Sequence, residues 1–228
     1  LPERKGLLAS GKFNQLEASI PYSALLRALR DLLDQLLCAA AEVVNSCKTA
    51  MLSALGGNAG VLIELLPRLG QLLGPQPPPR PLDPVAAHNR LQLVFREFLG
   101  AFTNNGHPVV LFLDDLQWSD PHTLDLIKYL LGHGLPGLLL VGAYRDNEVR
   151  EGHPLSVMLK TFADSPGVGH HRLRKLVIQP LGLEEVNQLV ADTLLRDSQD
   201  THALSALIHG KTYGNPFFAT HMLMSLHA

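Results

Sequence analysis

A run of five apolar residues that ends in two adjacent carboxylates constrains this chain more than any other feature. The run covers residues 109–113, and the carboxylates are Asp114 and Asp115. A short, continuous apolar run is typical of a strand that is buried on both faces, as strands of parallel sheets are. Open parallel sheets bind their ligands at the carboxyl ends of the strands. The run therefore predicts a parallel sheet with a polar site at one edge.

Strand and helix patterns alternate around this run. Further apolar runs predict strands at residues 6–10, 138–143 and 174–178. Helical periodicity predicts helices at residues 85–102, 121–131 and 153–162, the second of them with Asp120 as its N-cap. Alternation of the two patterns implies right-handed crossovers between parallel strands. We therefore expect an α/β fold in which helices flank a parallel sheet.

Helical segments lie on either side of this α/β region. Recurring leucines predict a helix that begins at Pro21, capped by Ser19, and further helices at residues 42–55 and 61–66. Six prolines within residues 74–84 predict an extended connector, because proline is excluded from helix interiors and central strands. Beyond residue 182, helices are predicted at residues 184–196, 201–209 and from Pro216 onward. We assign residues 1–180 to an α/β core and residues 181–228 to a helical segment.

The two carboxylates have the form of a Walker B motif. Asp114, at the end of the strand, would hold the Mg²⁺ of a bound nucleotide, mainly through water. Side chains alternate along a strand, so Asp115 is expected to point elsewhere and to polarise an attacking water. The alternative is that the strand simply ends in a turn that caps a helix.

Arg145 follows the next predicted strand and is expected at the same edge of the sheet. A fixed guanidinium there would sense or stabilise the charge of a γ-phosphate. The alternative is an exposed arginine paired with Asp146 or Glu148.

A second match to a nucleotide motif is interpreted as accidental. Residues 6–12 fit the first seven places of the phosphate-binding loop G-x-x-x-x-G-K-[ST], but Phe13 stands where the hydroxyl belongs. Only five residues precede this segment, and no clear helix follows it. We therefore do not assign a phosphate-binding loop to it.

Composition excludes several classes of function. The formal charge is −2, from 19 basic and 21 acidic residues, and no basic block is present, so nucleic-acid binding is not expected. No apolar run reaches the roughly 18–20 residues that a membrane span needs. Cys38 and Cys47 are too few for a disulfide framework and lack the spacing of a metal site. A reducing compartment, the cytoplasm, is therefore predicted.

Four segments together resemble a known family. They are GKFNQLEASIPYSALLRAL, HPVVLFLDDLQWSDPHTLDLIKYLL, LLLVGAYRDNEVREGHPL and KTYGNPFF, in the family's order. They resemble the AAA-type ATPase module of the STAND class of signalling P-loop NTPases. The resemblance is closest to the module of bacterial proteins that also carry a serine/threonine kinase, a GAF domain and a histidine kinase.

The resemblance implies a role for each matching residue. Asp114 and Asp115 match the Walker B acids, Arg145 matches the sensor-1 arginine, and Pro216 matches a lid proline that packs against adenine. It implies ATP and Mg²⁺ as cofactors, and residues 181–228 as part of a helical lid. It also places Gly11, Lys12 and Phe13 after the family's second strand, outside its P-loop.

The family's first strand and Walker A loop precede the part that this chain matches. We therefore expect a sheet that lacks its first strand, an incomplete lid, and weak nucleotide binding by a fragment of a longer protein. The expected function is an ATP-binding, ATP-hydrolysing switch that works with neighbouring kinase, GAF and histidine kinase domains. One alternative is a non-catalytic regulatory or interaction module, and another is the ATPase core of a transcription activator.

Overall fold

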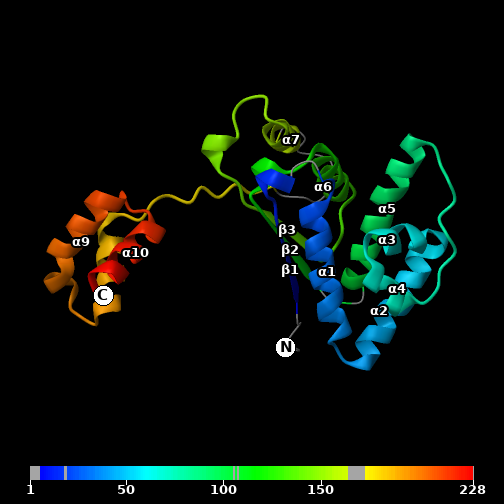
Figure 1. Ribbon diagram of the computed structural model, residues 1–228, viewed down its shortest axis with the longest axis horizontal. Helices are drawn as coiled ribbons and strands as arrows, with labels where there is room; N and C mark the ends of the chain where they lie inside the picture. The colour runs from blue at the N-terminus through cyan, green and yellow to red at the C-terminus, as the bar shows by residue number, and fades with distance from the viewer. Residues whose placement is uncertain (1–5, 18–19, 105, 107, 164–172, 228) are drawn as a thin grey trace. The chain divides into compact units, whose positions relative to one another are not determined.

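The computed structural model describes residues 6–17, 20–104, 106, 108–163 and 173–227 (Figure 1). The chain divides into two compact units, Leu1–Leu173 and Arg174–Ala228. Each unit has a hydrophobic core of its own, and the two cores share no residue. The units are therefore described one at a time.

The first unit is built on a parallel sheet, as predicted. Its described strands are β1 (Leu7–Lys12), β2 (Val109–Asp114) and β3 (Leu138–Gly142), in the order β1-β2-β3. The register pairs Lys12 with Asp114 and Leu113 with Gly142, so the carboxyl ends of the strands meet at one edge.

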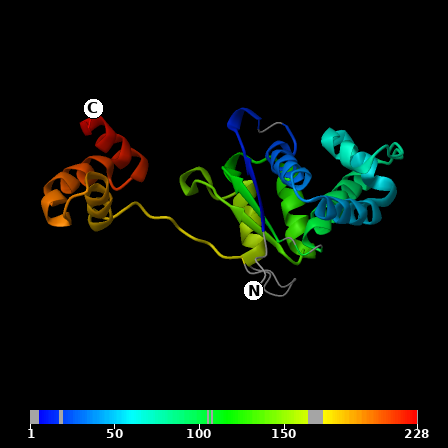
Figure 2. The ribbon, with the colours of Figure 1, turned by 90° about the horizontal axis from the view of Figure 1, so that it is seen from below.

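Helices flank this sheet and bury alternate residues of β1 and β2. The helices of the first unit are α1 (Ser23–Leu37), α2 (Ala41–Leu55), α3 (Ala59–Leu65), α4 (Pro67–Leu73), α5 (Pro84–Thr103), α6 (Pro121–His133) and α7 (Pro154–Ala163). Helix α1 lies along the sheet, and α2, α3 and α4 gather beside α1 and α5 (Figures 1 and 2). The central strand buries Val109, Leu111 and Leu113 against them, which explains its apolar sequence.

The first helix begins later than its sequence suggests. Helix α1 starts at Ser23, and Pro21 lies in the turn before it. The N-cap is Tyr22, in the left-handed conformation at φ 61°, and its amide donates to the Asp120 carboxylate and the Thr123 hydroxyl. This contact with α6, which the sequence does not reveal, determines where the helix starts. Ser19, the predicted cap, lies outside the described residues.

Prolines mark the boundaries of the next helices. Pro67 ends the α3 pattern as expected, but it also begins α4, a helix that the sequence analysis missed. Residues 74–83 form no regular element, and Pro84, the last residue of the predicted connector, is the first residue of α5. Asp83 then caps α5 by accepting from the amides of Val85 and Ala86.

Two expectations for the later strand segments of the sequence are wrong. Strand β3 was expected to be buried, but Leu139 and Val141 are 57% and 38% exposed. Residues 174–178 were expected to form a strand, but they are irregular, and Leu176 and Ile178 are about 90% exposed. A strand needs a hydrogen-bonding neighbour. Among the described residues, no strand pairs with the outer edge of β3 or with this segment.

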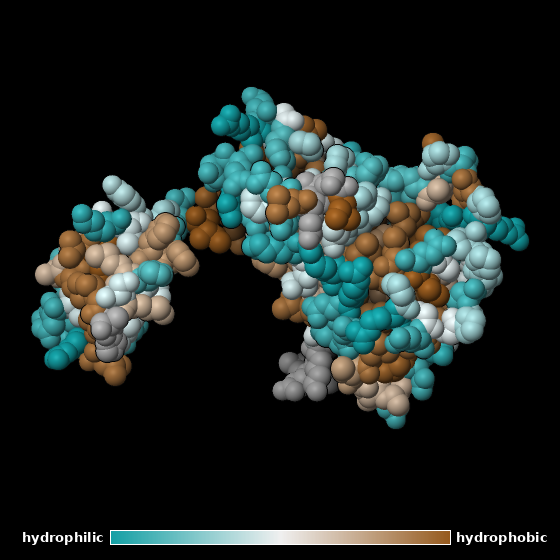
Figure 3. Space-filling view, in the orientation of Figure 1, coloured by the Kyte–Doolittle hydropathy of each residue, from teal (hydrophilic) through white to brown (hydrophobic). Residues whose placement is uncertain are grey.

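The second unit is a small helical bundle. It consists of α8 (Leu183–Leu194), α9 (Ser198–Thr212) and α10 (Pro216–His227), around a core of Val186, Val190, Ile208, Ala219 and Leu223. The amide oxygen of Asn187 accepts from the hydroxyls of Thr201 and Ser205, which ties α8 to α9. Apolar side chains also lie on its surface (Figure 3), among them Leu195, Phe217 and Met224.

In the described part of the chain, no helix has both the length and the apolar character that crossing a membrane requires.

Candidate functional site

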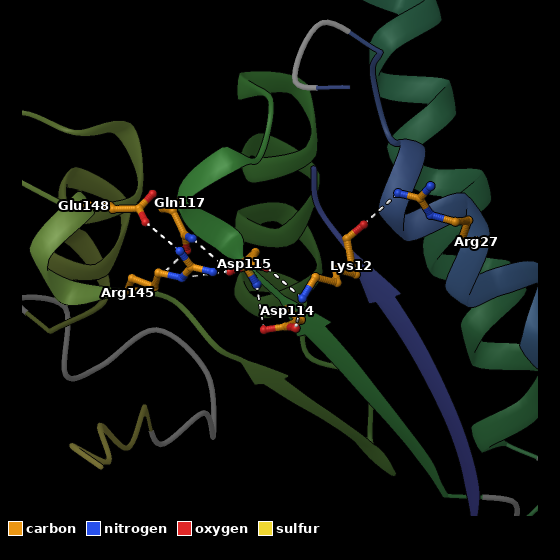
Figure 4. A network of polar contacts seen from close by, with 7 residues as sticks. All are labelled: Lys12, Arg27, Asp114, Asp115, Gln117, Arg145 and Glu148. Atoms are coloured by element: carbon orange, nitrogen blue, oxygen red, sulfur yellow. Dashed lines mark hydrogen bonds and ion pairs between the residues drawn. The ribbon is translucent and has the colours of Figure 1, made fainter. Parts of the chain in front are cut away.

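The carboxyl edge of the sheet carries a cluster of charged side chains (Figure 4). Asp114 is the last residue of β2, and Asp115 follows in the left-handed conformation, at φ 54° and ψ 44°. This conformation is uncommon for residues other than glycine, and it is found preferentially at functional sites. The chain turns sharply here into a 3-10 helix, Leu116–Trp118.

This turn brings the two carboxylates together instead of separating them. The ammonium group of Lys12, at the end of β1, lies 3.0 Å from Asp114 Oδ2 and 3.0 Å from Asp115 Oδ2. The expectation that Asp115 points elsewhere is therefore wrong. Alternation holds only within the extended strand, and Asp115 has already left it.

The two carboxylates differ in burial and in electrostatic environment. The Asp114 side chain is 36% exposed, whereas the Asp115 side chain is 7% exposed. Burial raises the pKa of Asp115, but hydrogen bonds from Lys12 and Gln117 and the charges of Lys12 and Arg145 outweigh it, so its pKa lies below the usual value. Hydrogen bonds to Asp115 and Asp114 raise the pKa of Lys12. Asp115 is thus held as a carboxylate.

Arg145 approaches the same cluster from the loop after β3. Its Nε lies 3.5 Å from Asp115 Oδ1, and its Nη1 lies 3.1 Å from Glu148 Oε1. The guanidinium also stacks 5.2 Å from the centre of the Trp118 ring, a cation–π distance. Arg145 therefore lies at the predicted edge of the sheet, and it also forms the alternative ion pair with Glu148.

Gln117 connects the two loops, and the sequence analysis overlooked it. Its amide nitrogen donates to Asp115 Oδ1 at 2.9 Å, and its amide oxygen accepts from the Arg145 backbone amide at 3.2 Å. The side chain is 5% exposed. A glutamine two residues beyond a carboxylate pair gives little signal in a sequence, because its partner is 28 residues away.

Lys12 belongs to the accidental loop motif, and no sequence pattern predicts its contact with the carboxylates. The structure places it at the end of strand β1, so this segment is not a phosphate-binding loop. Gly11 before it packs against the backbone carbonyl of Ala24 in α1, with no room for a Cβ atom. The glycine therefore serves packing between β1 and α1.

A shallow pocket of about 530 Å³ opens beside the cluster, and every residue that lines it belongs to the first unit. Its lining consists of Lys12, Phe13, Asn14, Arg27, Asp115, Trp118 and Arg145. Three of these side chains are cationic and one is anionic. The pocket is thus suited to an anionic group that approaches the carboxylates.

The carboxylates fit a divalent cation as well as an ammonium group. One oxygen of each lies within 3.0 Å of a single cationic atom, so the two oxygens already converge on one point. Magnesium prefers such oxygens and usually takes its remaining ligands from water and phosphate. Among the described residues, no group of three or more His, Cys, Asp or Glu could hold a metal ion. A cation here would therefore need ligands from a bound phosphate or from water.

Pro216, the remaining predicted site residue, belongs to the second unit. It is the first residue of α10, after Gly214 at φ 74° and Asn215. The Asn215 side-chain oxygen accepts from the amides of Phe217 and Phe218, which caps the helix. The Leu181 amide donates to the Gly214 carbonyl oxygen at 2.8 Å. This segment is therefore held firmly within its own unit.

Comparison with known proteins identifies the family. The AAA ATPase domain family matches residues 1–141, more than half of the chain. The chain belongs to the AAA ATPase domain family. The matched part contains β1, β2, all of β3 except its last residue, and both carboxylates of the cluster.

Two curated proteins resemble this AAA ATPase domain chain. Hybrid signal transduction histidine kinase G of Dictyostelium discoideum is 28% identical over 95% of the chain and 8% of its own length. Peroxide stress-activated histidine kinase mak2 of Schizosaccharomyces pombe is 23% identical over 90% of the chain and 9% of its own length. The chain thus spans less than a tenth of either relative. No solved structure matches it significantly.

Proposed function

We propose that this AAA ATPase domain binds ATP with Mg²⁺ and acts as a nucleotide-dependent switch within a larger signalling protein of the histidine kinase type. The observation that carries the proposal is the convergence of Asp114 and Asp115 on one cation position at the carboxyl edge of a parallel sheet. Family membership and two histidine kinase relatives support it.

Each side chain of the cluster receives one role. Asp114, the more exposed carboxylate, would hold Mg²⁺, mostly through water. Asp115 would accept a hydrogen bond from the attacking water and so orient it. Arg145 would offer its guanidinium to the charge that develops on the γ-phosphate.

The reaction that suits these roles is phosphoryl transfer to water. When bound, Mg²⁺ would neutralise negative charge on the β- and γ-phosphates. Gln117 would hold Asp115 and the Arg145 loop in a fixed relation. The resemblance assigns the backbone amides that cradle phosphates to a Walker A loop, which the cluster itself does not contain.

The helices of the second unit complete the proposal. We assign α8, α9 and α10 to a lid whose position depends on the nucleotide, and the proposed adenine contact to Pro216. Both assignments rest on the resemblance to STAND proteins. ATP-bound and ADP-bound states would then differ in a signal that neighbouring domains read.

Calorimetry of Mg²⁺-dependent ATP binding tests the nucleotide function. We expect Asp114→Asn to weaken binding about tenfold or more when Mg²⁺ is present and to have little effect in EDTA. Asp31 is an exposed carboxylate on α1. Asp31→Asn removes the same charge and should leave ATP affinity unchanged, both with Mg²⁺ and in EDTA. Equal Mg²⁺-dependent affinity of Asp114→Asn and the unaltered chain would contradict the role of Asp114.

Turnover tests the role of Asp115 separately. We expect Asp115→Asn to retain ATP binding and to lose ATP hydrolysis by about a hundredfold, because an amide oxygen polarises water less than a carboxylate does. Both measurements belong on this chain and on a longer natural polypeptide that includes it. Unchanged hydrolysis would remove the water-orienting role.

A non-catalytic regulatory module is the second candidate. It is favoured by the fact that Lys12 already forms ion pairs with both carboxylates within the protein, as in structural ion-pair networks. In that case the longer polypeptide would bind no ATP, and Asp114→Asn would affect only stability.

A further inference from the structure

Lys12 occupies the position on which both site carboxylates converge. It comes from β1, and its register partner on β2 is Asp114 itself. Its ammonium nitrogen is 3.0 Å from an oxygen of each carboxylate. An oxygen pair in this arrangement is the kind of ligand set that a divalent cation uses.

Hydrogen bonds fix the backbone around Lys12, whereas its ammonium group lies next to solvent. The Arg27 guanidinium donates to the Lys12 carbonyl oxygen at 2.7 Å, and the Phe13 amide donates to the Asp114 carbonyl oxygen at 3.0 Å. The Lys12 side chain, in contrast, is 66% exposed. A long, exposed side chain on a fixed backbone can swing into solvent without disturbing the strands.

We propose that Lys12 is a built-in competitor for the divalent cation: it keeps Asp114 and Asp115 together when no cation is bound, and a cation must displace it. The proposal rests on the cation binding that the proposed function assigns to Asp114, next to Asp115. Its physical basis is exclusion, because an ammonium group and a metal ion cannot occupy the same position between two carboxylates.

Competition has a consequence for the order of binding. A free hydrated cation must separate Lys12 from two carboxylates and brings no anionic ligand of its own. A cation that arrives with phosphates brings extra oxygen ligands, and the displaced ammonium group then has an anion to pair with. Lys12 therefore biases the site against the free cation and toward the cation–phosphate complex.

Binding of Mn²⁺, followed by the electron paramagnetic resonance signal of the free ion, tests the proposal without any catalytic readout. We expect Lys12→Met to bind Mn²⁺ about three- to tenfold more tightly than the unaltered chain, because removing an ammonium group removes a competing ion pair and a repulsive charge. Lys12→Gln should change the affinity in the same direction.

Two controls make the result decisive. Lys160→Met, on α7, removes an equal charge from an exposed pair with Glu151 and should leave Mn²⁺ affinity unchanged. Asp114→Asn should abolish the tight binding of the Lys12→Met chain. Circular dichroism of each variant confirms that it is folded.

The measurements distinguish failure of the competition by Lys12 from failure of cation binding at the carboxylates. Equal Mn²⁺ affinity of Lys12→Met and the unaltered chain overturns the competition while leaving the nucleotide function standing. Absence of Mn²⁺ binding in every folded variant overturns both the competition and the cation-binding role of the two carboxylates. Tighter binding in Lys160→Met as well assigns the effect to net charge and also overturns the proposal.

Discussion

At the scale of single residues, the site depends on polar groups that are buried or paired from different parts of the chain. Asp115 is buried beside Lys12, Gln117 and Arg145, so its charge is compensated on several sides. Removing one partner of such a group leaves a buried polar atom without a hydrogen bond. The resulting loss in the free energy of unfolding is larger than the contribution of an exposed ion pair. Gln117 is the residue at which this reasoning is easiest to test.

Gln117→Leu is expected to lower the free energy of unfolding by about 1–3 kcal/mol, since the Arg145 amide loses an acceptor and Asp115 loses a donor. Urea unfolding measures the loss. Gln188→Leu, on the exposed face of α8, is the matched control and should change stability by less than about 0.5 kcal/mol. Equal losses in the two variants would show that the Gln117 bridge contributes nothing specific.

At the scale of elements, one carboxylate joins two helices. Asp120 caps α6 through the Thr123 amide, as the sequence predicts, and it also accepts from the Tyr22 amide at the start of α1. A helix cap contributes about 0.5–2 kcal/mol by itself. Its second contact adds a link between segments that are 98 residues apart.

Asp120→Ala is therefore expected to cost about 2–3 kcal/mol, more than an ordinary cap. The comparison is Asp83→Ala, which removes a cap that contacts only α5 and should cost about 1 kcal/mol. Both values come from urea unfolding, followed by circular dichroism. If the two losses are equal, the contact between Asp120 and Tyr22 adds no stability.

At the scale of the whole molecule, the two units have separate cores of unequal size. The core of the second unit consists of five buried residues, whereas that of the first unit includes most of its helices and strands. A small core leaves a unit of about 55 residues marginally stable. The single tryptophan, Trp118, lies in the first unit and reports on that unit alone.

Val190→Ala should therefore affect the two units unequally. We expect it to destabilise the second unit by about 2 kcal/mol, because it leaves a cavity in a small core. The far-ultraviolet circular dichroism transition should move to lower urea, while the midpoint of Trp118 fluorescence stays unchanged. A matching shift in both signals would mean that the units unfold together.

Local sequence patterns predict most of the regular elements and the α/β class of the fold. Apolar runs located β2 and β3, leucine periodicity located α1, and Asp120 with Pro121 located the start of α6. These features depend on neighbours within a few residues, which a sequence displays directly. The carboxyl ends of neighbouring parallel strands lie at the same edge of a sheet, so the expected parallel pairing places Asp114, Asp115 and Arg145 at one edge.

The surroundings of those residues depend on contacts between distant parts of the chain. Lys12 contacts Asp114, which is 102 residues away, and Gln117 contacts Arg145, which is 28 residues away. No local sequence pattern predicts such contacts. The left-handed turn at Asp115, which overrides strand alternation, and the irregular backbone at 174–178 are likewise set by the surrounding fold. The sequence gives the chemical type of each side chain directly, whereas the distance between two charged side chains depends on how the strands pair.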